Sequence, residues 1–377
     1  MRKHVKKSLL LIIALTIALA LSLGFIACEW AITHQEDTRN HHEVITPDSV
    51  TNAIHFLGFG WADAFILQSV NEHGDTILGI VDAGLPGSHY YIADYARRIL
   101  GIGATEHFYF EFGISTHPHP DHNGGFTGGQ WGADYSFTSG LFSDPLITFR
   151  QFYFREHARD VNFWYTELVA QIARYQIPHM NNNAELQGHS FTFGDMRITL
   201  MFDNDRLTAD GVAPGTHLNP ESMAQLVEVN GQRILLTGDL CTATGDFVKE
   251  GIRAATDDST YWLNVLNLGH HGIHGTGVDG VLRYLNPTTM VTNNNGAELN
   301  TPRRQDAARA NALRQVRTQT PYARLFSMVD SGGIVLAIDA DGYRVGAIGE
   351  IPRFSPGETF TTTERVLTNW TGVPIEG

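Results

Sequence analysis

The sequence has only two cysteines, Cys28 and Cys241, in 377 residues. A network of disulfide bonds is therefore excluded as a source of stability. If Cys28 is cleaved off or lipidated, Cys241 is left alone, and we expect a buried, unreactive thiol there rather than a group at a metal site. The sequence also lacks internal repeats and any linker rich in proline, glycine and serine. One large folded domain is therefore expected.

Positive charge is scarce. The chain has 26 Lys and Arg residues against 40 Asp and Glu residues, which gives a formal charge of −14. Four of the basic residues and none of the acidic ones lie in the first 27 residues, so the rest of the chain carries −18. A surface this acidic repels phosphate backbones, and no Lys/Arg cluster offers a basic groove. Nucleic acid is therefore a disfavoured partner.

Residues 1–28 form a segment of their own. A basic start leads into an uncharged apolar stretch from Ser8 to Ala27. This pattern is typical of an export signal, and the stretch is long enough to span a bilayer as an uncleaved anchor. The four residues ending at Cys28 loosely resemble a lipobox, in which the cysteine is lipidated, although such boxes usually have leucine where Phe25 stands. Lipoprotein, signal anchor and secreted protein stay open, and each predicts an extracytoplasmic location.

The remaining residues predict a tether over 29–50, a catalytic domain over 51–350 and a C-terminal extension over 351–377. Residues 29–50 are polar and show no apolar period. Apolar runs in the domain predict two groups of strands with helices between them, which favours an α/β protein built as a layered helix-sheet-sheet-helix (αββα) sandwich. The strands are expected at 53–57, 64–68, 76–81, 108–116, 190–202, 223–229, 232–237, 262–268, 323–329, 333–338 and 343–347, and helices at 90–100, within 152–175 and at 302–318.

The densest group of potential metal ligands is the run His-Pro-His-Pro-Asp-His, which contains His117, His119, Asp121 and His122 and directly follows an apolar strand. Imidazole nitrogens and carboxylate oxygens are ordinary zinc ligands. Alternate residues of an extended segment project to one side, so His117 and His119 can share one ion while Asp121 and His122, beyond a turn, bind a second. Gly124 and the residue after it would let this loop fold back. The run therefore predicts a metal centre rather than a solvated surface loop.

Further ligand types follow two later strands. Asp239 comes after the strand at 232–237 and could bridge two cations, and His270 and His271 come after the strand at 262–268. The cofactors expected are two Zn²⁺ ions, with Mn²⁺ or iron as alternatives. Asp63 and Asp82 lie in predicted turns beside strands, and we expect them to support the metal loops by hydrogen bonds rather than to react.

These segments resemble the metallo-β-lactamase superfamily, whose HxHxDH motif matches the run from His117 to His122. The resemblance implies a bridging role for Asp239 and a ligand role for His271, the histidine before Gly272, which leaves His270 to contact substrate or protonate the leaving group. The superfamily usually has a further histidine ligand where His217 stands, 22 residues before Asp239. ComEC-like members have Asn or Ser in this region, so His217 and Asn219 stay alternatives.

A finer likeness is to the hydrolase domain of ComEC-type DNA-uptake proteins and to phosphorylcholine esterase. It rests on the Gly-rich segment from Gly58 to Ala64, on Asn219 with Ser222, and on His-His-Gly at 270–272. The resemblance spans about residues 53–350 and does not cover 126–210.

The function predicted is that of an exported two-zinc hydrolase. The two ions would lower the pKa of a water molecule, and Asp121 or Asp239 would orient it toward the substrate. A phosphodiester, of the phosphorylcholine type or another small molecule or cell-envelope material, is the first choice because two cations can bind two oxygens of one phosphate. The alternatives are an extracellular nuclease of the ComEC type, a β-lactam or lactone hydrolase, and a non-catalytic metal-binding envelope protein.

Overall fold

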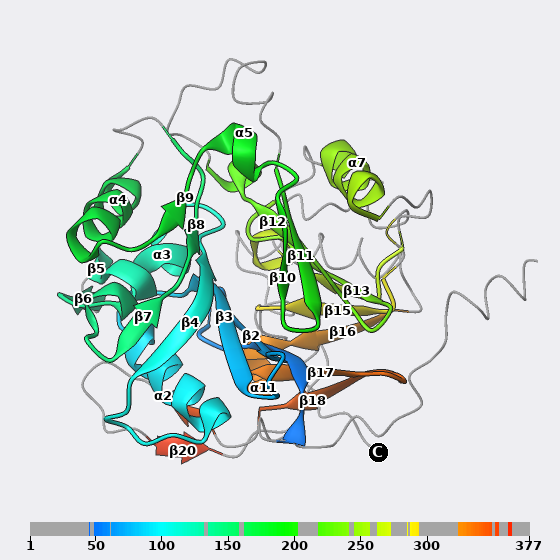
Figure 1. Cartoon of the computed structure of the whole chain (residues 1–377), viewed down its shortest axis with the longest axis horizontal. Helices are drawn as coiled ribbons and strands as arrows, with labels where there is room; N and C mark the ends of the chain where they lie inside the picture. Colours follow the sequence, from blue (N-terminus) through cyan, green and yellow to red (C-terminus); the bar gives the residue numbers. More distant parts are fainter. Residues whose placement is uncertain are drawn as a thin grey trace, which may run out of the picture. The chain divides into compact units, whose positions relative to one another are not determined.

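Two β-sheets are built from the apolar runs of the chain (Figure 1). The computed structural model describes residues 45, 49–60, 62–131, 135–157, 162–202, 218–240, 245–256, 262–272, 285, 287–293, 323–348, 351–353 and 361–363. All of these belong to one compact unit, Asn40–Gly377. The export segment, both cysteines, His217 and the helix expected at 302–318 lie outside the described residues.

The first sheet has the strand order β18-β17-β1-β2-β3-β4-β8-β9, with β7 beside β4. Its neighbours pair antiparallel from β18 to β3, and parallel from β3 onward. The strands are β1 (Asn52–Phe56), β2 (Ala64–Val70), β3 (Thr76–Ala83), β4 (Phe108–Ile114), β7 (Ile147–Phe149), β8 (Phe152–Tyr153), β9 (His179–Met180), β17 (Ile334–Asp339) and β18 (Gly342–Ala347).

The second sheet has the order β10-β11-β12-β13-β14-β15-β16. It is antiparallel from β10 to β13 and parallel from β13 to β16. The strands are β10 (Ser190–Phe193), β11 (Met196–Met201), β12 (Ala224–Val229), β13 (Gln232–Leu236), β14 (Val265–Asn267), β15 (Thr289–Thr292) and β16 (Arg324–Ser327).

Helices cover the outer face of each sheet. Successive side chains of a strand point to opposite faces, so in β2 Phe65 enters the core between the sheets while Ile66 packs under the helices. The helices over the first sheet are α2 (Ser88–Leu100), α3 (Pro120–Thr127) and α4 (Phe163–Tyr175). In the second sheet Leu226 and Leu235 face α7 (Gly245–Thr256) through Ile252. Figure 1 shows α7 on the opposite side of the sheets from α2, α3 and α4, so the predicted αββα sandwich is confirmed.

The shorter elements were mostly not predicted. They are β5 (Gly129–Trp131), β6 (Tyr135–Phe137), η2 (Leu141–Ser143), α5 (Asn183–Leu186), η3 (Asn219–Glu221), η5 (His270–Gly272), α11 (Met328–Ser331), β19 (Ile351–Arg353) and β20 (Thr361–Thr363). The aromatic stretch from Phe152 begins as strand β8 rather than helix, because Phe152 pairs with Gly113 of β4 and lies in the core. Within the described residues no helix is long and apolar enough to span a membrane.

Strand ends that carry the predicted site meet at one edge of each sheet. Strands β3 and β4 are parallel, as are β13, β14 and β15, so their C-terminal ends lie together within each sheet. Strand β2 runs the other way, and the pairing of Ala64 with Ala83 brings its N-terminal end to the same edge. A backbone bond from Met223 N–H to the Thr116 carbonyl (2.9 Å) joins the two sheets there.

Candidate metal centre

The run of predicted ligands is part loop and part helix. His117 follows β4, and His119 is the N-cap residue of α3, which begins at Pro120. Proline suits the first position of a helix because its φ is already helical and no N–H partner is needed there. The turn expected between His119 and Asp121 is therefore the start of a helix. Asp121 and His122 project from the first turn of α3 instead of from a turn.

The glycines after this run act differently from the prediction. A Cβ on Gly125 would lie 1.9 Å from the Ala83 carbonyl oxygen, so only glycine lets α3 pack this closely on β3. Gly124 similarly meets Pro86. The two glycines thus press the helix that carries Asp121 and His122 against the end of β3, rather than folding a loop back.

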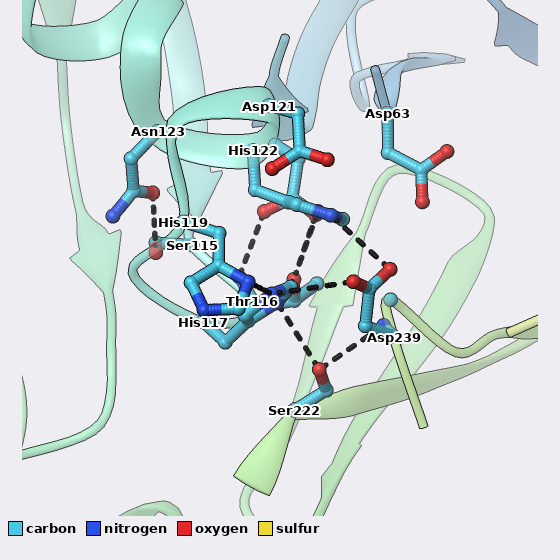
Figure 2. Close-up of polar contacts among 12 residues, drawn as sticks. Asp63, Ser115, Thr116, His117, His119, Asp121, His122, Asn123, Ser222 and Asp239 are labelled. Atoms are coloured by element: carbon cyan, nitrogen blue, oxygen red, sulfur yellow. Dashed lines mark hydrogen bonds and ion pairs between the residues drawn. The ribbon is translucent and has the colours of Figure 1, made fainter. Parts of the chain in front are cut away.

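The first ligand group consists of His117, His119 and Asp239, which offer ligand atoms within 4.8 Å of one another. His117 Nε2 lies 2.9 Å from His119 Nδ1 and 3.5 Å from Asp239 Oδ2. Figure 2 shows these side chains converging from the β4 and β13 ends. Two nitrogens and one carboxylate oxygen form a donor set that suits a divalent transition metal.

The second ligand group consists of Asp121, His122 and His271. His271 Nε2 lies 3.2 Å from Asp121 Oδ2, and Asp239 Oδ1 lies 3.2 Å from His122 Nε2 and 3.5 Å from His271 Nε2. Asp239 thus presents Oδ2 to the first group and Oδ1 to the second. The predicted ligands brought together are His117, His119, Asp121, His122, Asp239 and His271. Their metal-binding roles stay predictions.

Asp82 positions His122 of the second group through the ring nitrogen that faces away from the other ligands. Its carboxylate accepts the Thr116 N–H (2.8 Å) and the Thr116 hydroxyl (2.7 Å), and Oδ2 contacts His122 Nδ1 at 2.7 Å. A histidine that ligates a metal through one nitrogen is typically oriented by such a contact at the other. The predicted hydrogen-bonding role of Asp82 is confirmed.

In the first group, hydroxyl groups instead of a carboxylate contact the Nδ1 atom of His117. The Ser222 hydroxyl lies 3.1 Å from His117 Nδ1, and it accepts the Asp239 N–H at 3.0 Å. The Thr116 hydroxyl is also 3.1 Å from His117 Nδ1. Ser222 therefore ties the ligand loop of the first sheet to the bridging carboxylate of the second, as Figure 2 shows.

Two asparagines at the site escaped prediction. Asn293 follows β15, and its Nδ2 lies 2.6 Å from His271 Nδ1 and 2.7 Å from Asp63 Oδ1. Asn162 caps α4 and donates from Nδ2 to the Pro118 carbonyl (2.7 Å). A signal for Asn293 is present, since this asparagine follows a short run rich in β-branched residues, Thr-Met-Val-Thr. That run was overlooked because it is only four residues long.

His270 stands outside both ligand groups. Its Nε2 lies 4.0 Å from Asp239 Oδ2 and 2.9 Å from Asn219 Nδ2, and its side chain is 27% exposed. His271 is 4% exposed and turned inward. The choice between His217 and Asn219 as a ligand stays open, because His217 is outside the described residues, whereas Asn219 contacts His270.

Backbone strain concentrates at the centre. Among the described residues, five non-glycine residues have positive φ, and three of them are Asp82 (53°), His270 (48°) and His271 (56°). Such conformations persist only where the surrounding structure imposes them, and they cluster at functional sites. The adjacent positive φ values turn the two histidines after β14.

The protein groups alone give the histidines opposite charge states. Burial, together with neighbouring histidines, lowers the pKa of His117 and of His119. Burial also opposes charge on His122 and His271, but nearby carboxylates outweigh it and raise the pKa of His122 well above its usual value and that of His271 to about 9. Although burial disfavours its charge, these histidines lower the pKa of Asp239 well below the usual range.

The donor set fits divalent cations. His122 Nε2 and Asp239 Oδ1 are buried, and neither has a hydrogen-bond partner of good geometry among the described residues. Buried polar atoms without partners are costly and are usually paired or bound to metals. Histidine nitrogens and carboxylate oxygens accommodate zinc, manganese and iron, so the residues do not select one metal.

No family model and no curated protein matches this sequence. Among solved structures, a variant of the β-hydroxylase CmlA has 11% identity and a TM-score of 0.42, with 76% of this chain and 54% of that chain covered. Human tRNase Z, short form, has 12% identity, coverages of 64% and 92%, and a TM-score of 0.31. The metallo-β-lactamase MIM-1 from Novosphingobium pentaromativorans has 12% identity, coverages of 71% and 89%, and a TM-score of 0.28.

The chain spans about half the length of the hydroxylase, which is a diiron enzyme in Streptomyces venezuelae. Likenesses at these identities and scores say nothing of activity. The fold follows from this chain itself, because two face-to-face sheets with outer helices hold a His/Asp cluster at their strand ends. This is the metallo-β-lactamase fold, with a His/Asp cluster that could hold metal ions. The finer likeness to ComEC-type proteins and phosphorylcholine esterase stays a prediction.

Proposed function

We propose that this protein is a binuclear metal-dependent hydrolase that cleaves a phosphodiester. The observation that carries the proposal is the position of Asp239, which presents one carboxylate oxygen to each ligand group. A pair of cations that share a carboxylate can hold two oxygens of one phosphate, stabilise charge on the leaving oxygen and supply an activated water. The ligands proposed are those of the two groups, with Zn²⁺ as the first choice and Mn²⁺ or iron as alternatives.

We assign Asp121 to the attacking water and His270 to the leaving group. In the reaction a water oxygen attacks phosphorus, one P–O ester bond breaks, and the proton lost by water ends on the leaving oxygen. The Asp121 side chain is 22% exposed. Although burial opposes its charge, His122 and His271 lower its pKa, so Asp121 is ionised and can accept a hydrogen bond from the attacking water. His270, held by Asn219, faces outward and can contact the leaving group.

The substrate class rests on the sequence. The resemblance to phosphorylcholine esterase supports a choline-phosphate ester or another cell-envelope phosphodiester. The charge of −18 beyond residue 27 opposes a nuclease. The basic and apolar start of the chain supports export, with the protein either secreted or held at the membrane through residues 1–28 or a lipid on Cys28.

A parallel assay tests this function. The purified full chain, loaded with Zn²⁺, is compared on bis(p-nitrophenyl) phosphate, p-nitrophenyl phosphorylcholine, single-stranded DNA and a β-lactam. His119→Ala serves as the inactive control. We expect turnover of the two phosphodiesters that is lost in the control. Turnover of the β-lactam alone, or of DNA alone, would replace the substrate class but keep the centre.

Metal content separates an enzyme from a non-catalytic binding protein. We expect close to two Zn²⁺ ions per chain by mass spectrometry of the metal. Fewer than one ion per chain, together with no hydrolysis of any of the four substrates, would overturn the proposed function in favour of a metal-binding envelope protein.

A further inference from the structure

Asp63 lies beside the second ligand group. It precedes β2 and its side chain is buried, with 1% exposed. Its N–H donates to the Asp121 carbonyl (3.1 Å), and its own carbonyl accepts the Gly84 N–H (2.8 Å). The backbone of Asp63 is thus attached both to the helix that carries Asp121 and to the end of β3, and its position is set by the same contacts that place the ligands.

The two carboxylate oxygens of Asp63 have different surroundings. Oδ1 accepts a hydrogen bond from Asn293 Nδ2 at 2.7 Å. Oδ2 is buried and has no hydrogen-bond partner among the described residues. A supporting role through Asn293 uses only Oδ1 and leaves the unpaired oxygen unexplained, although a buried carboxylate oxygen without a partner is costly.

The carboxylate also lies within reach of a shared ion. Asp63, Asp239 and His271 offer ligand atoms within 4.8 Å of one another. Figure 2 shows the Asp63 side chain on the same side of the site as Asp121, with one oxygen directed toward Asp239. A cation in contact with the second ligand group would therefore meet a third carboxylate.

Charge balance points the same way. The centre contains four carboxylates, those of Asp63, Asp82, Asp121 and Asp239, and the histidines are neutral when they ligate. Two divalent cations carry four positive charges, so the four carboxylates neutralise them. An ionised Asp63 would therefore offset part of the charge of the cations in a buried site, where uncompensated charge is unfavourable.

We propose that Asp63 is an additional oxygen ligand, through Oδ2, of the cation at the second ligand group. The inference rests on the two-metal centre of the proposed function but not on its substrate. It makes the second position richer in oxygen than the first, with Asp63, Asp121 and Asp239 joining His122 and His271.

The test uses Asp63→Asn in the full chain. Asparagine keeps an oxygen for the bond from Asn293 and replaces Oδ2 by an amide nitrogen, which does not ligate. Co²⁺ binding to the metal-free protein is followed by calorimetry and by visible absorption, whose intensity reports coordination number. We expect two Co²⁺ ions in the unchanged protein. In the variant the second should bind more than about 100-fold more weakly, beyond the loss of about 10- to 100-fold from removing an outer partner, and its absorption should change.

Two further variants separate ligation from support. Asp195→Asn removes a carboxylate that is hydrogen-bonded to Asn52 at the turn before β11, far from the ligand edge, and should bind both ions as the unchanged protein does. Asn293→Ala removes the support of Asp63 but keeps its carboxylate, so the second ion should bind more tightly than in Asp63→Asn and with unchanged absorption. Equal losses with unchanged absorption in both site variants would overturn the inference.

The outcomes also distinguish the two proposals. Fewer than two ions in the unchanged protein would overturn the binuclear centre itself. Two ions with the same affinity and absorption in Asp63→Asn would overturn only the role of Asp63. If that variant does not fold, a crystal structure of the Zn²⁺-loaded unchanged protein decides. Oδ2 at about 2.0–2.2 Å from the ion supports the inference, and a separation beyond about 3 Å overturns it.

Discussion

The two ligand groups contain the same residue types but differ in charge. In the first group, His117 and His119 have lowered pKa values and are neutral at pH 7. In the second, His122 and His271 have raised pKa values, so without a cation they hold protons. Cations must therefore displace protons from the second group but not from the first.

The difference comes from the carboxylates around each ring, because Asp239 raises the pKa of His122 most and Asp82 adds to that effect. His117 Nδ1 faces the hydroxyls of Ser222 and Thr116, whereas His122 Nδ1 faces the carboxylate of Asp82 at 2.7 Å. Hydroxyls do not favour a charged ring as a carboxylate does, and burial then decides against charge. Two histidines five residues apart thus acquire opposite protonation through partners that are distant in the sequence.

The largest effect is expected from Asp239→Asn, because both ligand groups share that carboxylate. We expect both metal affinities to fall and hydrolysis of bis(p-nitrophenyl) phosphate to drop by more than about 1000-fold, since loss of an outer partner alone costs about 10- to 100-fold. Metal content and turnover measure this, with circular dichroism as the control for folding. Turnover like that of the unchanged protein would show that Asp239 does not bridge.

His119→Ala should break the first group alone. The second group keeps its residues, so we expect one tightly bound ion per chain instead of two, with hydrolysis reduced to background and the fold intact. Metal analysis after dialysis checks the stoichiometry. Retention of two tightly bound ions would remove His119 from the ligand set.

Removing a residue that supports a ligand from outside the metal centre should weaken metal binding at one ligand group only. Asp82→Asn removes the charge behind His122 and Ser222→Ala removes the hydroxyl behind His117. Each substitution should weaken the binding of one of the two ions by about 10- to 100-fold. Proton release on binding, measured by calorimetry in buffers of different ionisation enthalpy, should fall in Asp82→Asn and stay unchanged in Ser222→Ala. The same proton release in both variants would contradict the role assigned to Asp82.

Stability of the metal-free protein should depend on pH in a window set by the second group. A pKa of His271 raised from 6.5 to about 9 stabilises the fold fully below pH 6.5, and this is lost as pH rises through 9. His122 acts in the same direction. The lowered pKa values of His117 and Asp239 change the stability of the fold only below pH 6.5. Chelated protein should therefore melt several degrees lower at pH 9 than at pH 6.5, measured calorimetrically. A melting temperature that rises over this range would contradict the charge difference.

The smallest effect is expected from Asn162→Ala. Asn162 caps α4 and donates to the Pro118 carbonyl between His117 and His119. Losing a cap costs about 1 kcal/mol of stability, and the first group should loosen slightly while the second is unaffected. Urea unfolding measures the loss, and unequal changes in the two metal affinities show the asymmetry. Equal weakening of both ions would mean that this contact does not act on the first group.

Much of the fold and the ligand types could be read from the sequence. Short apolar runs predict strands at 64–68 and 76–81, and the structure extends them to 64–70 and 76–83. The spacing of His117, His119, Asp121 and His122 likewise indicates a metal centre, because these residues are close together in the chain. A helix starting inside that run was missed, since its packing on Ala83 through Gly125 is a long-range contact.

Only the tertiary structure decided how these groups meet. Six strand ends bring Asp63, Asp82, Asp239 and Asn293 around the histidines, although they are spread over 230 residues. No local pattern encodes which histidine faces Asp82, which one faces Ser222, or that Oδ2 of Asp63 is left without a partner. Charge states depend on burial and on distances between atoms of different strands, and those exist only once the two sheets have packed.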